Sequence, residues 1–86
     1  MNILGDIGNT ETKIFLVSTK NKIIKKISFS TKDLNQNKLN KLFTKLNIDY
    51  NKLEKLLFCS VVPKSFNLIK KYLLKKTKLK CFEVKN

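Results

Sequence analysis

Residues 3–10, Ile-Leu-Gly-Asp-Ile-Gly-Asn-Thr, decide the fold of this 86-residue chain. This stretch begins with two apolar residues, and the two glycines of the chain flank the carboxylate of Asp6. We predict a strand that enters a tight turn at Gly8 and Asn9, because both residue types tolerate a positive φ angle. The β-branched and aromatic run at residues 12–17 predicts a second strand, which completes a hairpin.

The hairpin has two chemical interpretations. The backbone N–H groups of such a turn can form an anion-binding concavity, and an acid at the strand end can hold Mg²⁺ while the metal bridges phosphates. Alternatively, Asp6 merely caps the turn that Gly8 and Asn9 make. Spacing alone leaves these interpretations evenly matched. Lys13 follows on the second strand but is one of 19 lysines, so solvation is its simplest role. The motif is neither a Walker A nor a G-x-G-x-x-G sequence.

The pattern changes after a third predicted strand at residues 22–29. Thr31 or Asp33 is a candidate cap for a helix whose apolar residues recur at helical spacing. A continuous apolar run at residues 56–62 predicts a strand buried on both faces, as in a parallel position, although residues 52–57 also fit a helical turn. The predicted stripe of the first helix is Leu39, Leu42, Phe43 and Leu46.

Pro63 ends this apolar run, and Ser65 is predicted to cap a second helix. A last short strand is predicted at residues 80–84. The order βββαβαβ implies an α/β fold, with a mixed sheet and helices packed on it. The predicted inward residues of the second helix are Phe66, Ile69, Tyr72 and Leu73.

Composition restricts the function classes. The chain has no His, which excludes the commonest zinc ligand and the usual Ser-His or Cys-His nucleophile. A net charge of +13 invites a nucleic-acid interpretation, yet the basic residues are all Lys, without the guanidinium forks that clamp phosphate bidentately. Five aromatic side chains interleaved with the lysines also fall mostly on predicted core faces, which makes them poor stacking platforms. These are Phe29, Phe43, Phe58, Phe66 and Tyr72.

The two cysteines, Cys59 and Cys81, form no C-x-x-C pair and lie in apolar runs. We expect both thiols to be buried and reduced, as in the cytoplasm. No secretory leader is recognisable, and no segment approaches the ~20 apolar residues of a membrane span.

Two motifs carry a resemblance to a known family. The string Asp6–Thr10 after an N-terminal strand is similar to the first phosphate motif of the acetate and sugar kinase/Hsc70/actin superfamily, and it resembles type III pantothenate kinases in particular. Residues 59–63, Cys-Ser-Val-Val-Pro, resemble the Ser-Val-Val-Pro segment at the end of that family's fourth strand. The predicted order βββαβαβ matches the ribonuclease-H-like half of this actin-like ATPase fold.

The resemblance implies ATP-dependent phosphorylation of pantothenate, the first committed step toward coenzyme A. Asp6 would place Mg²⁺, and the backbone around Gly8, Asn9 and Thr10 would cradle the ATP phosphates, with Lys13 nearby. The segment Ser60, Val61, Val62 and Pro63 would line the substrate cleft or shape a subunit contact. The family typically uses Mg²⁺ with a monovalent cation such as K⁺, and it works as a homodimer.

The sequence departs from the family at two positions. Gly5 stands where an apolar residue is usual, and Glu11 stands where Asn is frequent, so an acid would repel phosphates unless it points away. Family members also continue through a second half, whose Gly-x-Asp-Arg segment carries the acid thought to activate the pantothenate hydroxyl. We therefore expect residues 1–86 to form one N-terminal lobe, with the second lobe and the general base absent.

Alone, such a lobe would have little or no kinase activity. It would require a complementary C-terminal lobe, and its sheet would expose apolar area that promotes self-association. The alternatives are a non-catalytic, partner-binding member of the same family and a small basic nucleic-acid-binding protein.

Overall fold

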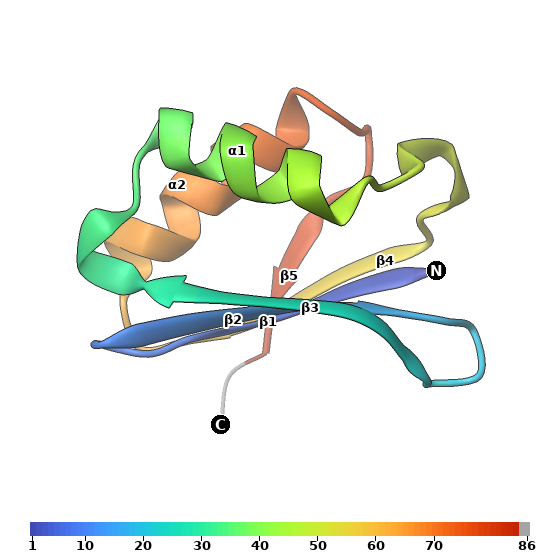
Figure 1. Cartoon of the computed structure of the whole chain (residues 1–86), viewed down its shortest axis with the longest axis horizontal. Coiled ribbons are helices and arrows are strands. Elements are labelled where there is room, and N and C mark those ends of the chain that lie inside the picture. Colours follow the sequence, from blue (N-terminus) through green and yellow to red (C-terminus); the bar gives the residue numbers. More distant parts are fainter. Residues whose placement is uncertain (85–86) are drawn as a thin grey trace.

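Five strands form one mixed sheet, and two helices lie on the same face of it (Figure 1). The computed structural model describes residues 1–84. The sheet order is β3-β2-β1-β4-β5; the β1–β2 and β2–β3 pairs are antiparallel, and the β1–β4 and β4–β5 pairs are parallel. This arrangement confirms the predicted α/β class and the βββαβαβ order. The elements are β1 (Asn2–Ile7), β2 (Glu11–Val17), β3 (Ile23–Ser30), α1 (Gln36–Leu46), β4 (Lys55–Ser60), α2 (Pro63–Leu74) and β5 (Cys81–Glu83), with 3₁₀ turns at Thr31–Asp33 and Tyr50–Lys52.

The core lies between the helices and the covered face of the sheet. Alternate strand residues such as Ile3, Ile14 and Leu56 point into it and are fully buried. The rings of Phe43 and Tyr72 join α1 to α2, with their centroids 5.2 Å apart. All eight helix residues that were predicted to face inward are buried, because their helical spacing forms one stripe on each helix.

Both helices begin at residues other than the predicted caps. Asn35 caps α1, since its side-chain oxygen accepts a hydrogen bond from the Lys38 N–H at 2.8 Å. Thr31 and Asp33 instead lie in a 3₁₀ turn. Helix α2 begins at Pro63, two residues before Ser65, because the first turn of a helix tolerates a residue without an N–H. Both cap predictions were therefore wrong.

The apolar run at residues 56–62 is a strand, as predicted, but it ends at Ser60 and is fully buried on one face only. Phe58 is completely buried, whereas its neighbour Leu57 is half-buried. The expectation of burial on both faces was wrong because α1 and α2 cover the same side of the sheet (Figure 1). The alternative of a helical turn over residues 52–57 is also wrong, since β4 begins at Lys55.

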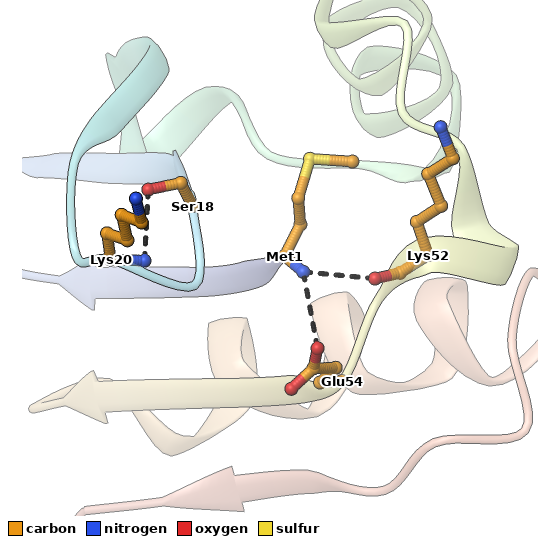
Figure 2. Close-up of polar contacts among 5 residues, drawn as sticks. All are labelled: Met1, Ser18, Lys20, Lys52 and Glu54. Carbon is orange, nitrogen blue, oxygen red and sulfur yellow. Dashed lines mark hydrogen bonds and ion pairs between the residues drawn. The ribbon is translucent and has the colours of Figure 1, made fainter.

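Backbone contacts at the start of the chain align β1 with β4 (Figure 2). The amine of Met1 donates to the Lys52 carbonyl at 3.0 Å and lies 4.0 Å from the Glu54 carboxylate. The Glu54 N–H in turn donates to the Met1 carbonyl at 2.8 Å. These contacts support the parallel register that pairs Asn2 with Lys55.

The turn between β2 and β3 is closed by a side chain. The Ser18 hydroxyl oxygen accepts hydrogen bonds from the backbone N–H groups of Lys20 and Lys22, and Figure 2 shows the first of these. The Ser18 hydroxyl thus accepts hydrogen bonds from N–H groups that have no strand partner where the chain reverses. Among the helices within residues 1–84, none has the length and apolar character needed to cross a membrane.

Candidate functional site

The hairpin between β1 and β2 closes through a hydrogen bond from the Gly8 N–H to the Glu11 carbonyl, 3.0 Å long. Neither Gly8 nor Asn9 has a positive φ angle, so the predicted reason for these residue types was wrong. Gly8 is required for a different reason. A Cβ atom at that position would lie 3.1 Å from the Glu11 carbonyl oxygen, which is tighter than ordinary packing.

Two buried threonines hold the hairpin in place through hydrogen bonds. The Thr31 hydroxyl donates to the Gly8 carbonyl at 2.8 Å, and the hydroxyl oxygens of Thr12 and Thr31 are also 2.8 Å apart. A hydroxyl has one proton, and that of Thr31 is used on Gly8, so Thr12 must donate to Thr31. The Thr31 N–H additionally donates to the Thr10 carbonyl at 3.0 Å. The two carbonyls of the turn are thus fixed by one residue.

Sequence reasoning missed this role of Thr31, which it treated as a helix cap. A signal was present in β2. Thr12 occupies the same alternating face as Ile14 and Leu16, and a hydroxyl at a core position requires a partner. The sequence does not indicate which distant residue supplies that partner.

The turn also presents backbone N–H groups that are free to donate hydrogen bonds. Asn9 and Thr10 are exposed, and their backbone N–H groups have no hydrogen-bond acceptor among residues 1–84. Because the carbonyls of Gly8 and Thr10 are occupied by Thr31, the turn is held while these N–H groups remain available. Unpaired N–H groups on a fixed turn can receive an anion.

The Asp6 carboxylate is exposed at the end of β1, opposite Lys13 on β2 and Cys59 on β4. Within residues 1–84 it makes no hydrogen bond and no ion pair. Lys13 instead contacts Glu11, with 3.6 Å between the ammonium nitrogen and a carboxylate oxygen. The Glu11 carboxylate therefore lies beside the positive charge of Lys13, which reduces the repulsion that Glu11 was expected to exert on phosphates.

The unpaired carboxylate of Asp6 fits the way in which phosphate-transfer enzymes bind Mg²⁺. Mg²⁺ is usually held by one or two carboxylates together with substrate phosphates and water. The described residues contain no cluster of three or more Asp, Glu, Cys or His side chains. A metal at Asp6 would accordingly depend on the nucleotide for its other ligands.

The second motif lies beside the first. The Val61 N–H donates to the Ile7 carbonyl at 3.0 Å, directly after Asp6 in the chain. The Ser60 hydroxyl oxygen accepts from the Val62 N–H at 3.0 Å and turns the chain toward Pro63 at the start of α2. The structure thus brings the two motifs to the same end of the parallel β1–β4 pair. A role of this segment in a substrate cleft stays a prediction.

A hollow of about 240 Å³ lies beside the hairpin, between the 3₁₀ turn at Thr31–Asp33 and the first turns of α2. Lys32 and Lys64 are among its lining residues. The sequence did not single out either lysine, because the chain contains 17 other lysines. Their charges add to a positive field near the hairpin, which attracts anionic ligands.

Comparison with known proteins identifies the family. Residues 2–86 match the model of the family described as type III pantothenate kinase. The chain belongs to the type III pantothenate kinase family. A curated type III pantothenate kinase of Pelagibacter ubique (strain HTCC1062) is 53% identical over 85 residues. That match covers 99% of this chain but 34% of the relative, so the chain spans about a third of that kinase's length. The family resemblance inferred from Asp6–Thr10 and residues 59–63 is confirmed.

Proposed function

We propose that the chain is the ATP-phosphate-binding lobe of a pantothenate kinase, which converts ATP and pantothenate to ADP and 4'-phosphopantothenate. Residues 1–86 would be one lobe, and the remaining length of the kinase would supply the second. The observation that carries the proposal is the exposed hairpin, which contains both the free N–H groups of Asn9 and Thr10 and the unpaired carboxylate of Asp6. Family membership supports it independently.

Each hairpin residue then has a defined task. Asp6 would hold Mg²⁺, and the bound metal would supply positive charge to the transferred phosphoryl group. The backbone N–H groups of Asn9 and Thr10 orient the phosphates, and the Thr31 contact keeps the turn in place. Lys13 adds positive charge, shared with Glu11 at 3.6 Å. Ser60, Val61, Val62 and Pro63 line the substrate side of the cleft or a subunit contact.

We propose that the general base comes from the two thirds of the kinase that this chain does not span. Apart from Asp6, no acid within residues 1–84 both lies at this turn and lacks a partner. Glu11 is paired with Lys13, and Asp49 accepts a hydrogen bond from the Asn51 N–H. Phosphoryl transfer needs groups on both sides of the transferred phosphate, so the chain alone would bind nucleotide without transferring phosphate. The complete enzyme would use K⁺ with Mg²⁺, work as a homodimer and reside in the cytoplasm.

Calorimetric titration with ATP tests the hairpin through a reversal of sign. With Mg²⁺ present, Asp6→Asn should weaken ATP binding, because the metal loses its protein ligand. Without Mg²⁺, the same substitution should leave binding unchanged or tighter, because a negative charge near the phosphates is removed. Asp33→Asn is the matched control, since Asp33 is also exposed but lies in the 3₁₀ turn. An identical response of both variants in the two conditions would refute the site.

Activity is tested by co-producing the chain with the remaining two thirds of the Pelagibacter ubique kinase. Transfer of labelled phosphate to pantothenate should require both parts and should be lost with Asp6→Asn. No product under any metal condition would contradict the proposal and favour a non-catalytic, partner-binding role.

The nucleic-acid alternative is not supported by the packing of the aromatic side chains on which it was based. The five aromatic side chains considered as stacking platforms are all buried. Oligonucleotide binding should therefore be weak and sequence-independent. Tight binding with a steep salt dependence would instead favour this alternative.

A further inference from the structure

The charged side chains of the hairpin pair in a way that the strand register does not require. Asp6 on β1 stands directly opposite Lys13 on β2, so the two side chains share one face of the sheet. Opposite charges at facing positions of an antiparallel pair attract one another. Lys13 nevertheless pairs with Glu11, two residues earlier on its own strand, with 3.6 Å between the ammonium nitrogen and a carboxylate oxygen. Two acids therefore compete for one lysine, and Glu11 holds it.

The result of this competition decides whether the Asp6 carboxylate is free. Within residues 1–84, Asp6 has no ion-pair partner, and its neighbour on β4 is the uncharged Cys59. An ammonium group bonded to Asp6 would occupy a carboxylate oxygen and cancel the negative charge that a divalent cation needs. The pairing with Glu11 keeps Lys13 near the turn without this loss.

We propose that Glu11 is a positioning residue for the metal site: by holding Lys13, it keeps the Asp6 carboxylate free for the Mg²⁺ that accompanies the nucleotide. The inference rests on the proposed function. The size of the effect is that of an exposed ion pair, because the side chains of Lys13 and Glu11 are 44% and 54% exposed. Such pairs change an equilibrium constant by about two- to fivefold.

Two roles of Glu11 predict opposite changes in ATP binding. If Glu11 acted only as a negative charge near the phosphates, its removal would tighten ATP binding both with and without Mg²⁺. If Glu11 instead holds Lys13, its removal releases the lysine to Asp6, and the metal loses its free carboxylate. The sign of the change in the presence of Mg²⁺ therefore distinguishes the two roles.

Calorimetric titration of the chain with ATP measures this sign. With Mg²⁺ present, Glu11→Gln should weaken ATP binding about two- to fivefold. With EDTA in place of Mg²⁺, the same substitution should leave binding unchanged or tighter. Tighter binding of ATP by Glu11→Gln in the presence of Mg²⁺ would overturn the proposal.

Glu54→Gln is the matched control for these titrations. Glu54 is also an exposed acid near a cation, since its carboxylate lies 4.0 Å from the Met1 amine. This pair lies at the opposite end of β1 and β4 from the hairpin. The substitution should therefore change ATP binding in neither condition.

The Lys13→Gln background separates positioning from direct contact. Without Lys13 there is no ammonium group to hold away from Asp6, so Glu11→Gln should no longer weaken Mg²⁺-dependent ATP binding. An equal weakening in both backgrounds would mean that Glu11 acts on the metal or the phosphates itself, which contradicts a positioning role.

A measurement without nucleotide locates the Lys13 ammonium directly. A carbodiimide joins a carboxylate to an amine in contact with it, and peptide mass spectrometry identifies the linked residues. The unchanged chain should link Lys13 to Glu11, and the Glu11→Gln variant should link Lys13 to Asp6. A Glu11→Gln variant in which Lys13 gains no link to Asp6 would refute the proposal.

These measurements also separate the inference from the proposed function. If Lys13 moves to Asp6 but Asp6→Asn leaves Mg²⁺-dependent ATP binding unchanged, the proposed function is refuted, and the metal role of Glu11 is refuted with it. If Asp6→Asn weakens this binding but Lys13 does not move in Glu11→Gln, only the inference about Glu11 is wrong.

Discussion

The two faces of the sheet differ in what covers them, although their residues alternate along the same strands. Leu56 on the covered face is fully buried by the helices, while Leu57, the next residue, is half-buried on the opposite face, which carries no helix within residues 1–84 (Figure 1). The same alternation separates Ile14 from Phe15 on β2. Within residues 1–84, α1 and α2 cover the first of these faces, and no helix covers the second (Figure 1). The covered face therefore contributes most of the packing that stabilises the fold.

The largest effect is expected from a matched pair of leucines on β4. Leu56→Ala should cost about 2–5 kcal/mol of the free energy of unfolding, because it leaves a cavity under the helices. Leu57→Ala should cost about 1 kcal/mol or less in the chain alone, since its side chain is partly solvated. Urea unfolding monitored by circular dichroism measures both values. Equal losses would mean that the two faces are equally packed.

The cysteines provide a chemical version of the same comparison. Burial raises the pKa of the Cys81 thiol from 9.0 to about 11. At pH 8, Cys81 in the folded chain should react with iodoacetamide about 100-fold more slowly than in the chain unfolded by urea, because the thiolate is the reactive form. Peptide mass spectrometry measures both rates. Cys59 is the less protected control, because it is half-buried, so the expectation that both thiols are buried was wrong for Cys59.

The shifted pKa of Cys81 also affects stability. As the pH rises, the Cys81 thiol ionises in the unfolded chain before it does in the folded chain. The contribution of the raised pKa to the free energy of unfolding is therefore complete below pH 9 and is lost as the pH rises toward 11. A Cys81→Ser variant should show a weaker decline of stability over this range. An identical decline in both proteins would contradict the assigned burial.

Gly5 tests how closely the covered face is packed beside the hairpin. A Cβ atom at Gly5 would overlap the buried ring of Phe58, which itself packs on Phe66 with ring centres 5.9 Å apart. Gly5→Ala should therefore cost about 1–3 kcal/mol. Adding Phe58→Leu should cost less in the Gly5→Ala background than in the unchanged chain. Additive losses in this double-mutant cycle, measured by urea unfolding, would show that the two positions do not interact.

The smallest effect is expected at the threonine pair under the hairpin. Thr31→Val removes the donor to the Gly8 carbonyl and the acceptor for Thr12, which should cost about 1–2 kcal/mol. Thr31→Ser keeps the hydroxyl and should restore hydrogen-exchange protection around the turn. If Thr31→Val and Thr31→Ser weaken Mg²⁺-dependent ATP binding equally, the hydroxyl does not position the hairpin.

Much of the fold was predictable because local patterns and covalent order agree. The helical spacing of Leu39, Leu42, Phe43 and Leu46 placed the face of α1 correctly, since one stripe had to be buried. The starts of both helices were less predictable. Thr31 is a good cap by residue type, yet its hydroxyl bonds to Gly8, 23 residues away. A residue type shows which hydrogen bonds a side chain can make, but tertiary contacts decide which one forms.

Family membership and the candidate site were determined by short strings of sequence. Asp6–Thr10 and residues 59–63 carried the resemblance that predicted the family, and their part in binding phosphate stays a prediction. Their juxtaposition required the parallel pairing of β1 with β4, which local sequence does not specify. Only the tertiary structure showed that Glu11 contacts Lys13 and that Thr31 fixes the turn. It also decided which face of each strand the helices cover, because strand alternation defines two faces without choosing the partner of either.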